Sequence, residues 1–382
     1  MGEYTKWVAC WGNATSIREN TECMYAKDIT LHYPIQMCFS GNKLRFHFSN
    51  ITGTESVTFK ACFMQFALEG KERQLQHPIL LNGEEDITIE AGEQVVSDPV
   101  CCDIQKDEYI IVQLYLPDYT QMNAGVLITG PLSMGQYSYG NHLFEKEVDI
   151  RLIRHMNWFY FLNTIDIYTE ENNRAFICYG DSITAQDWPD DLTLRLQKEG
   201  ITNVSVIRRA ISGTRILREY DCITYAAYGR KGERRFALEM DVAGAEAVLI
   251  QHGINDMIHP VGTDVNIFRP MSDLPTAEEL EKGFEEIYIN HARKLGYRVY
   301  GGTLLPIEGW RTYAPFREEL RNAFNDWLRT TPLLDGCVDF DKAVCDPEHP
   351  SRFKDIYDSG DHLHPSEKGY EKMAETVDLS FM

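Results

Sequence analysis

A serine at the end of a short apolar run has surroundings that suit nucleophilic chemistry. Residues 175–179, Ala-Phe-Ile-Cys-Tyr, predict a buried strand, and the chain then turns at Gly180 and Asp181 to reach Ser182. A serine at the start of the helix that follows a strand is presented at the edge of a sheet. Gly, Asp and Ser are also common at strand-to-helix turns because they cap helices, so this turn by itself permits both interpretations.

A possible base for this serine lies near the other end of the chain. Asp361 precedes His364 by three residues in the run Asp-His-Leu-His-Pro. On a helical turn this spacing puts both side chains on one face, so the carboxylate can select the imidazole tautomer whose other nitrogen accepts a proton. Together with Ser182 this pair predicts acyl transfer. A metal site made of Asp361, His362 and His364 lacks a further ligand, so we expect none.

Two further turns offer hydrogen-bond donors for a developing negative charge. Gly213 follows a predicted strand, and its backbone N–H has no side chain in the way. Asn255 follows an apolar run and carries a neutral N–H₂ group. Both types also occur in ordinary turns and caps. His252 and His259 flank Asn255, and we expect them to be structural because no metal-ligand set accompanies them.

The pattern of the C-terminal half predicts how these residues are positioned. Predicted strands cover 174–179, 204–207, 247–251, 298–303 and 336–340. The clearest predicted helices cover 277–295, 316–329 and 366–376. This alternation is typical of a parallel sheet with helices on both faces, which binds ligands beyond the carboxyl ends of its strands. We therefore expect the clusters to meet at that edge.

The N-terminal half has a different texture. Period-two alternation at 43–48, 56–60 and 109–115 predicts short strands separated by turns, with almost no helical pattern. We predict a β-sandwich of jelly-roll type. A polar turn at 170–173 predicts a boundary, with one domain at 1–172 and the other at 173–382.

Composition limits the classes of partner. Of the 382 residues, 37 are Lys or Arg and 58 are Asp or Glu, giving a formal net charge of −21. Such acidity argues against nucleic acid and anionic membranes and suits a neutral substrate. There is no apolar run long enough for a membrane span and no basic-then-apolar leader at residues 1–7. The ten cysteines are scattered, so we expect reduced thiols and a cytoplasmic protein.

Taken together, the four blocks resemble the SGNH, or GDSL-type, hydrolase superfamily, which is named for its Ser, Gly, Asn and His. By this resemblance Ser182 is the nucleophile, His364 the general base and Asp361 the residue that orients it. The backbone N–H groups of Ser182 and Gly213 and the side chain of Asn255 form the oxyanion hole. The resemblance implies a flavodoxin-like α/β/α three-layer domain and a reaction without metal or cofactor.

The resemblance covers roughly residues 172–382 and has two departures. Thr184 stands where the nucleophile elbow of α/β-hydrolases has a glycine. The spacing around Ser182 matches the GDSL pattern instead. Many relatives carry Asn at the positions held here by Arg208 and Thr214, so the hydrogen bonds around Gly213 are expected to differ.

The front half extends the resemblance to two-domain carbohydrate acetylesterases of xylan and mannan type. It opens with a Trp-rich segment at 7–11, and the loop 302–310 also looks like that group. The implied substrate is an O-acetylated oligosaccharide, contacted by Asp181, Glu308 and Trp310, the last by stacking on a sugar. Alternatives are a lysophospholipase or thioesterase, and a carbohydrate-binding protein with a decayed site. The complete set of expected catalytic residues argues against decay.

Overall fold

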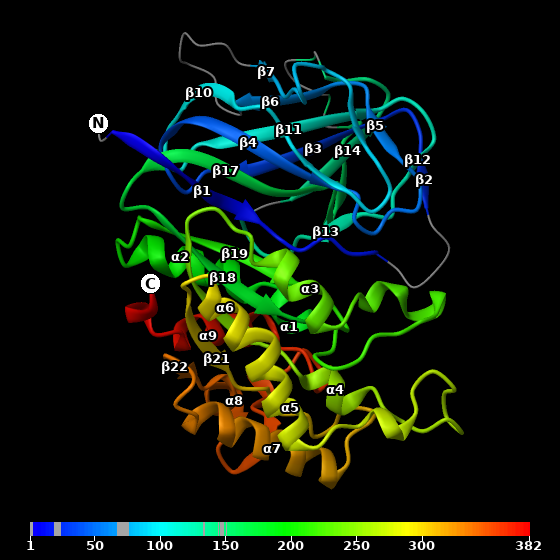
Figure 1. Cartoon of the computed structure of the whole chain (residues 1–382), viewed down its shortest axis with the longest axis vertical. Helices are drawn as coiled ribbons and strands as arrows, with labels where there is room; N and C mark the ends of the chain where they lie inside the picture. The colour runs from blue at the N-terminus through cyan, green and yellow to red at the C-terminus, as the bar shows by residue number, and fades with distance from the viewer. Residues whose placement is uncertain are drawn as a thin grey trace. The chain divides into compact units, whose positions relative to one another are not determined.

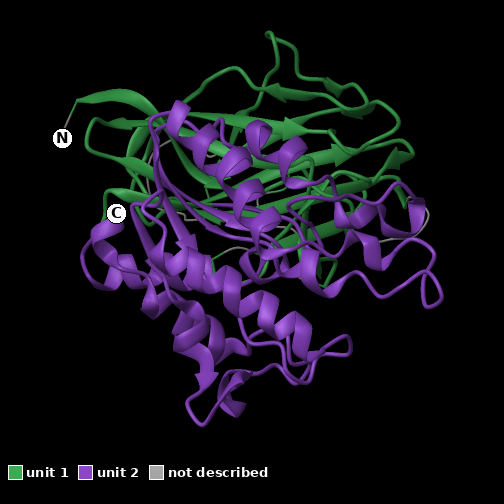
Figure 2. Cartoon of the chain, turned by 60° about the horizontal axis from the view of Figure 1, so that its bottom comes forward, with its two compact units in different colours: residues 1–175, 202–207 green, residues 176–201, 208–382 purple. Residues whose placement is uncertain are grey.

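The computed structural model describes residues 3–18, 24–66, 76–132, 134–143, 145, 149 and 151–382. The chain forms two compact units (Figure 2). Unit 1 comprises residues 1–175 and 202–207, and unit 2 comprises residues 176–201 and 208–382. In the described part, no helix combines the length and the apolar character that a membrane crossing requires.

Unit 1 consists of antiparallel sheets (Figure 1). Its main strands are β1 (Tyr4–Gly12), β3 (Ile29–Gln36), β4 (Gly41–Ser49), β6 (Cys62–Phe66), β7 (Gln76–Pro78), β9 (Gln94–Val96), β10 (Val100–Ile104), β11 (Tyr109–Leu116), β14 (Gly135–Tyr139), β15 (Arg154–Met156) and β17 (Leu162–Glu170). One sheet has the order β1-β17-β4-β10, with β9 beside β4, and the other has the order β15-β14-β3-β11-β6-β7. Shorter pairs join β2 (Tyr25–Ala26) to β12 (Thr120–Gln121), β5 (Val57–Phe59) to β8 (Ile87–Ile89), and β13 (Gly125–Leu127) to β16 (Trp158–Tyr160).

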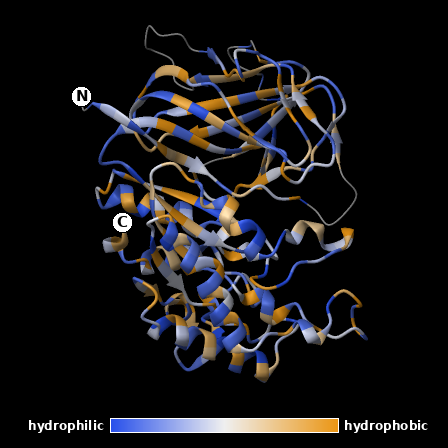
Figure 3. Ribbon diagram, in the orientation of Figure 1, coloured by the Kyte–Doolittle hydropathy of each residue, from blue (hydrophilic) through white to orange (hydrophobic). Residues whose placement is uncertain are grey.

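Alternation of buried and exposed side chains explains these strands. In β10, Val100, Cys102 and Ile104 are buried while Cys101 is exposed, because successive side chains of a strand point to opposite faces. The same alternation of apolar and polar positions runs along the strands of unit 1 in Figure 3. The predicted β-sandwich class is confirmed, while the jelly-roll type stays a prediction.

Unit 2 alternates strands and helices. Its strands are β20 (Ala245–Gln251), β21 (Arg298–Gly302), β22 (Gly336–Val338), β23 (Cys345–Asp346) and β24 (His349–Phe353), together with most of β18 (Arg174–Gly180) and the end of β19 (Val204–Ala210). Residues 174–175 of β18 and 204–207 of β19 count with unit 1. Its α-helices are α1 (Ser182–Ala185), α2 (Trp188–Lys198), α3 (Gly232–Glu239), α4 (Ile254–Ile258), α5 (Ala277–Gly283), α6 (Asn290–Lys294), α7 (Pro315–Thr330), α8 (Phe340–Val344) and α9 (Glu367–Thr376). Short turns of other helix types are η1 (Ile223–Tyr228), η2 (Met271–Asp273), η3 (Phe284–Ile289), η4 (Asp355–Tyr357) and η5 (Leu379–Phe381).

The central sheet has the order β19-β18-β20-β21-β22, and the pairs β20/β21 and β21/β22 are parallel. Counted along the chain this is the order 2-1-3-4-5 of flavodoxin-like folds. Burial is nearly continuous along β18 and β20, as expected for strands covered on both faces. Helices α2, α8 and α9 pack together, and α3, α5 and α7 form a second group with η3. The predicted α/β class is confirmed.

Two predicted elements differ in detail. The predicted helix at 277–295 is a succession of α5, the π-helical η3 and α6. The predicted strand at 336–340 ends at Val338, because Asp339 caps α8 by accepting the backbone N–H of Lys342.

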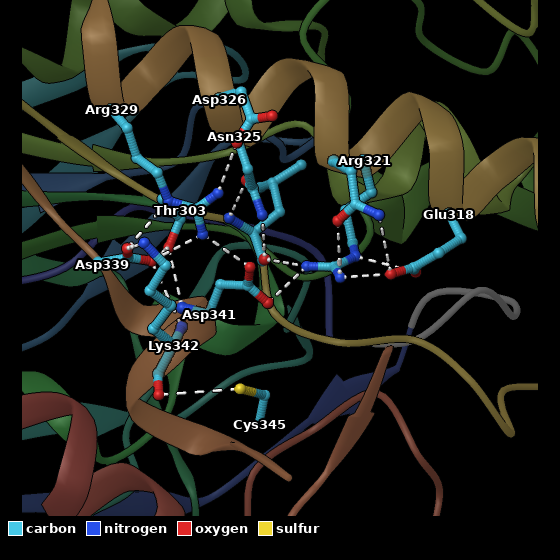
Figure 4. Close-up of polar contacts among 12 residues, drawn as sticks. Thr303, Glu318, Arg321, Asn325, Asp326, Arg329, Asp339, Asp341, Lys342 and Cys345 are labelled. Atoms are coloured by element: carbon cyan, nitrogen blue, oxygen red, sulfur yellow. Dashed lines mark hydrogen bonds and ion pairs between the residues drawn. The ribbon is translucent and has the colours of Figure 1, made fainter. Parts of the chain in front are cut away.

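A buried polar network joins α7 to the chain that follows β21 (Figure 4). Arg321 donates to the Leu304 carbonyl over 2.9 Å and to Asp341 over 2.6 Å. Asn325 accepts the Leu304 N–H over 2.7 Å and donates to its carbonyl over 2.9 Å. Arg329 pairs with the same Asp341 over 2.7 Å. The network therefore fixes the start of the loop that leads to Trp310.

Replacing Arg321 by Met is expected to lower the free energy of unfolding by about 3–5 kcal/mol, because Asp341 loses a buried partner. Arg321 is only 1% exposed. Urea unfolding measures the change. Lys282→Met is the control, since its ion pair with Glu286 joins side chains that are 72% and 62% exposed and should contribute under about 1 kcal/mol. Equal losses in the two variants would contradict this view of the network.

Candidate active site

Ser182, His364 and Asp361 form a continuous hydrogen-bonded line. Ser182 is the first residue of α1, directly beyond β18, and its Oγ lies 2.8 Å from His364 Nε2. His364 Nδ1 lies 2.7 Å from Asp361 Oδ2. Since a carboxylate only accepts, Nδ1–H donates to Asp361 and Nε2 is left to accept the serine proton. Ser182 and His364 are both half-buried, so the pair is reachable from solvent.

Asp361 is held by the turn that it begins. Its Oδ1 accepts the backbone N–H groups of Leu363 over 2.9 Å and His364 over 2.8 Å. Burial tends to raise the pKa of Asp361, but these bonds and the His364 side chain hold that pKa below its ordinary value. The helical turn expected at this place is wrong, because residues 361–364 form bends and α9 begins only at Glu367. An Asx-type turn brings the carboxylate to the imidazole instead.

The candidate oxyanion donors lie beyond the carboxyl ends of three adjacent strands. Ser182, as the first residue of α1, has a backbone N–H that no carbonyl of its helix can accept. Gly213 follows β19 with φ +78°, a conformation that favours glycine. Asn255, in α4, is buried and donates one N–H of its amide to the Thr214 carbonyl over 3.0 Å. Its second N–H has no acceptor among the described residues.

Arg235 of α3, which sequence reasoning missed, connects the strands that carry these groups. Its guanidinium is buried and donates to the Gly180 carbonyl over 3.1 Å and to the Arg209 carbonyl over 2.9 Å. It also donates to Thr214 Oγ1 over 2.8 Å, and Glu239 balances its charge over 2.9 Å. The ends of β18 and β19 are thereby tied to the Gly213 turn. In the sequence, only the spacing of four residues between Arg235 and Glu239 along a helix indicated this ion pair.

His252 and Asp256 hold the same turn from the side of β20 and α4. His252 lies 3.0 Å from Thr214 Oγ1 and 2.7 Å from the Tyr288 hydroxyl. Burial, reinforced by Arg235, lowers the pKa of His252 to about 3, so it is neutral and structural. Asp256 accepts the backbone N–H groups of Ile216 over 2.7 Å and Leu217 over 3.0 Å. Thr214, at a position where many relatives carry Asn, thus connects Arg235, His252 and Asn255.

The predicted substrate contacts have different surroundings. Asp181 is buried and caps α1 by accepting the Ile183 N–H over 3.1 Å, while burial raises its pKa to about 7. The structure thus gives it the task of a cap. Glu308 pairs with Arg352 over 2.7 Å and accepts the Ser351 hydroxyl. Trp310 lies beside the site, its ring 6.5 Å from that of His364 and nearly perpendicular to it.

A comparison with protein-family models matches residues 178–372 to the GDSL-like Lipase/Acylhydrolase family. The matched segment contains all five residues from Ser182 to His364 that we placed in the candidate site. No curated protein matches the chain.

Similar solved structures include three esterases. An acetylxylan esterase from Geobacillus stearothermophilus is 17% identical, with 54% of this chain and 94% of that chain covered and a TM-score of 0.37. A family two carbohydrate esterase from Cellvibrio japonicus is 8% identical, with 99% and 95% covered and a TM-score of 0.34. A carbohydrate acetylesterase from Xanthomonas citri is 7% identical, with 84% and 68% covered and a TM-score of 0.34.

Gly213→Ala is expected to lower kcat on p-nitrophenyl acetate by about 10²–10³, the effect of losing one oxyanion donor. A Cβ at this position would lie 2.1 Å from the Tyr228 ring, so the ring or the backbone N–H must move. Gly200→Ala is the matched control, because its φ of +76° imposes the same backbone strain with no atom within 4 Å of the new Cβ. Adding Tyr228→Ala to Gly213→Ala should restore part of the loss. A near-normal kcat in Gly213→Ala would show that the backbone N–H of residue 213 takes no part in the reaction.

Proposed function

Because this chain belongs to the GDSL-like lipase/acylhydrolase family and is a carboxylic ester hydrolase, we propose that it removes O-acetyl groups from carbohydrates, with Ser182 as nucleophile. The family match spans 178–372, just over half of the 382 residues. The observation that supports the mechanism most directly is the 2.8 Å hydrogen bond from Ser182 Oγ to His364 Nε2.

In the first step, Ser182 Oγ attacks the ester carbonyl while His364 Nε2 takes its proton. Asp361 stabilises the imidazolium that results, since the carboxylate with its lowered pKa remains ionised near neutral pH. The bond between the carbonyl carbon and the sugar oxygen then breaks, and His364 gives the proton to that oxygen. The sugar leaves with a free hydroxyl group. An acetyl group remains on Ser182.

The charge on the carbonyl oxygen is greatest in the tetrahedral intermediate. The backbone N–H groups of Ser182 and Gly213 and the second amide N–H of Asn255 are its donors. Because Arg235, His252 and Asp256 fix these donors before substrate arrives, little reorganisation is needed during the reaction. Water then attacks the acyl-enzyme by the same path, and acetate leaves.

Aromatic side chains beside the reacting groups support a sugar as the alcohol part of the ester. Trp310 borders His364, and Tyr228 and Tyr225 stack on each other with ring centroids 5.4 Å apart. Such rings suit the apolar faces of sugars. Tyr228 also packs against Gly213, so a long acyl chain at that N–H would have to displace a ring. This contact favours short acyl groups.

A lipid-directed acyl hydrolase is the second candidate, and an exposed apolar loop favours it. In this loop Val265 and Ile267 are 71% and 72% exposed and Phe268 is 41% exposed, and Ile223 of η1 is 70% exposed. Asn266 in the same loop donates to the Tyr225 hydroxyl over 2.6 Å, which connects the loop to the tyrosines beside Gly213. Side chains of this kind would suit a long acyl chain.

Chain-length preference separates the two candidates. With p-nitrophenyl acetate, butyrate and octanoate, we expect kcat/KM to fall steeply beyond the short acyl groups. Acetylated xylan and mannan oligosaccharides should release acetate, measured enzymatically. A preference for octanoate with no acetate release would contradict the carbohydrate proposal and favour the lipid one.

Ser182→Ala is expected to lower kcat by about 10⁶, as in other serine hydrolases, because no other group can carry the acyl intermediate. Stopped-flow measurements with p-nitrophenyl acetate should also show no burst of nitrophenol. Ser380→Ala, an exposed serine near the C-terminus, is the control and should keep its activity. Residual activity above about one per cent in Ser182→Ala would contradict the assignment of the nucleophile.

A further inference from the structure

Three arginines stand on the loops that follow β19, β20 and β21, and a fourth stands in the first turn of α7. We call Arg215, Arg269, Arg311 and Arg317 the arginine cluster. Burial lowers the pKa of His259 most, and the charges of Arg269, Arg215 and Arg311 lower that pKa further. Arg269 also lowers the pKa of Arg317, which burial lowers most. The charge of three of the four arginines thus acts on His259, and the charge of Arg269 acts on Arg317.

Little negative charge compensates this cluster. Arg215 pairs with Asp273 over 3.1 Å, whereas Arg317 donates to the backbone carbonyls of Met257 and Pro260. Within the described ranges, no carboxylate lies within 4.0 Å of Arg269, Arg311 or Arg317. The chain as a whole carries a formal charge of −21. A local group of arginines without carboxylate partners is therefore unlike the rest of this acidic chain. Like charges packed together without partners are costly unless they serve another purpose.

Several donors of the cluster have no acceptor in the protein. Arg215 is buried, with 2% of its surface exposed. Its Nε and Nη2 nevertheless have no hydrogen-bond partner in the described chain. The same holds for Arg269 Nε and for Nδ1 of His259. Buried polar groups are nearly always paired, so each such group calls for an explanation. Arg269 is only half-buried and Arg311 is exposed, so these two can reach a ligand from solvent.

Each of the two reachable arginines lies beside an aromatic ring of the candidate active site. The Arg269 guanidinium lies 6.0 Å from the centroid of Tyr225, which stacks on Tyr228, and Tyr228 covers Gly213. The Arg311 guanidinium lies 4.6 Å from the centroid of Trp310, which borders His364.

A direct link joins the loops that carry these two arginines. Thr312, next to Arg311, donates to the carbonyl of Ile258, next to His259, over 2.9 Å. Aromatic rings thus connect each of the two arginines to the residues of the candidate site.

We propose that Arg269 and Arg311 form a carboxylate subsite, and that the substrate is an O-acetylated sugar bearing a carboxylate, such as a uronic acid residue. The inference rests on the proposed function and narrows it. A guanidinium presents a planar fork of N–H donors that matches a carboxylate in a bidentate pair. Arg215 and Arg317 add positive potential from within the protein. Because screening limits fields to about 8 Å at physiological salt, this local charge outweighs the acidity of distant surfaces.

Two matched substrates test the subsite: O-acetylated galacturonate oligosaccharides and O-acetylated xylo-oligosaccharides. The wild type should favour the acidic substrate in kcat/KM by at least roughly 10-fold, the effect of one hydrogen bond to a charged group. Arg269→Gln and Arg311→Gln should each reduce this acidic-to-neutral ratio by roughly 10–100-fold, mainly through KM. Raising the salt to 0.5 M should increase KM for the acidic substrate only.

Arg293→Gln is the matched control. It removes the same charge from α6, which precedes β21 and so lies at the opposite end of the strands. The ratio should not change in this variant. If Arg269→Gln lowers activity on both substrates equally, the arginine only positions its loop and the subsite is wrong. Acetate release from both substrates without preference in the wild type would overturn the inference and leave the proposed function intact.

If neither oligosaccharide is hydrolysed, the proposed function is wrong. Inhibition by free sugars still tests the carboxylate subsite in that case. Galacturonate should inhibit p-nitrophenyl acetate hydrolysis at least roughly 10-fold more strongly than galactose, which has the same ring with a CH₂OH group. Arg269→Gln should abolish this difference. Equal inhibition by galacturonate and galactose would overturn the inference. Equal inhibition by galacturonate and inorganic sulfate would also overturn it, because the site would then select charge and not a sugar carboxylate.

Discussion

The buried guanidinium of Arg235 is the interaction on which the geometry of the site depends. It binds the carbonyls of Gly180 and Arg209, at or near the ends of adjacent strands, and the hydroxyl of Thr214. Ser182 stands two residues beyond Gly180, and Gly213 directly precedes Thr214, so one side chain sets the spacing of the proposed nucleophile and a proposed oxyanion donor. A buried cation of this kind is stable only with a close anion, which Glu239 supplies from the same helix.

The residues of the candidate site differ in their access to solvent. The groups that we propose exchange a proton, Ser182 and His364, are half-buried and meet solvent, and Asp361 is fixed by the turn of its own segment. The donors for the oxyanion are instead held by fully enclosed residues such as His252, whose low pKa keeps it neutral. A proton transferred at His364 therefore leaves the framework of the donors unchanged.

Strong local patterns predicted the architecture of both units. The apolar run at 175–179 lies within β18, the run at 247–251 lies within β20, and the amphipathic pattern at 316–329 corresponds to α7. Boundaries were less predictable, because caps decide them: Asp339 ends the fifth strand early by starting α8. Likewise, the spacing of Asp361 and His364 indicated a contact, but an Asx-type turn makes it in place of a helical one.

What the sequence by itself determined was local: the strand-to-helix turn at Ser182, the strand and helix types, and the Asp–His spacing near the C-terminus. These follow from hydrophobic periodicity and from turn chemistry over a few residues. Only the tertiary structure decided that Arg235 joins two strand ends, that Asp181 is enclosed as a cap, and that the charges of arginines from three loops act on His259. Those contacts join residues far apart along the chain, and the net charge of −21 gives no hint of a local excess of cations, because a sum over all residues contains no positions.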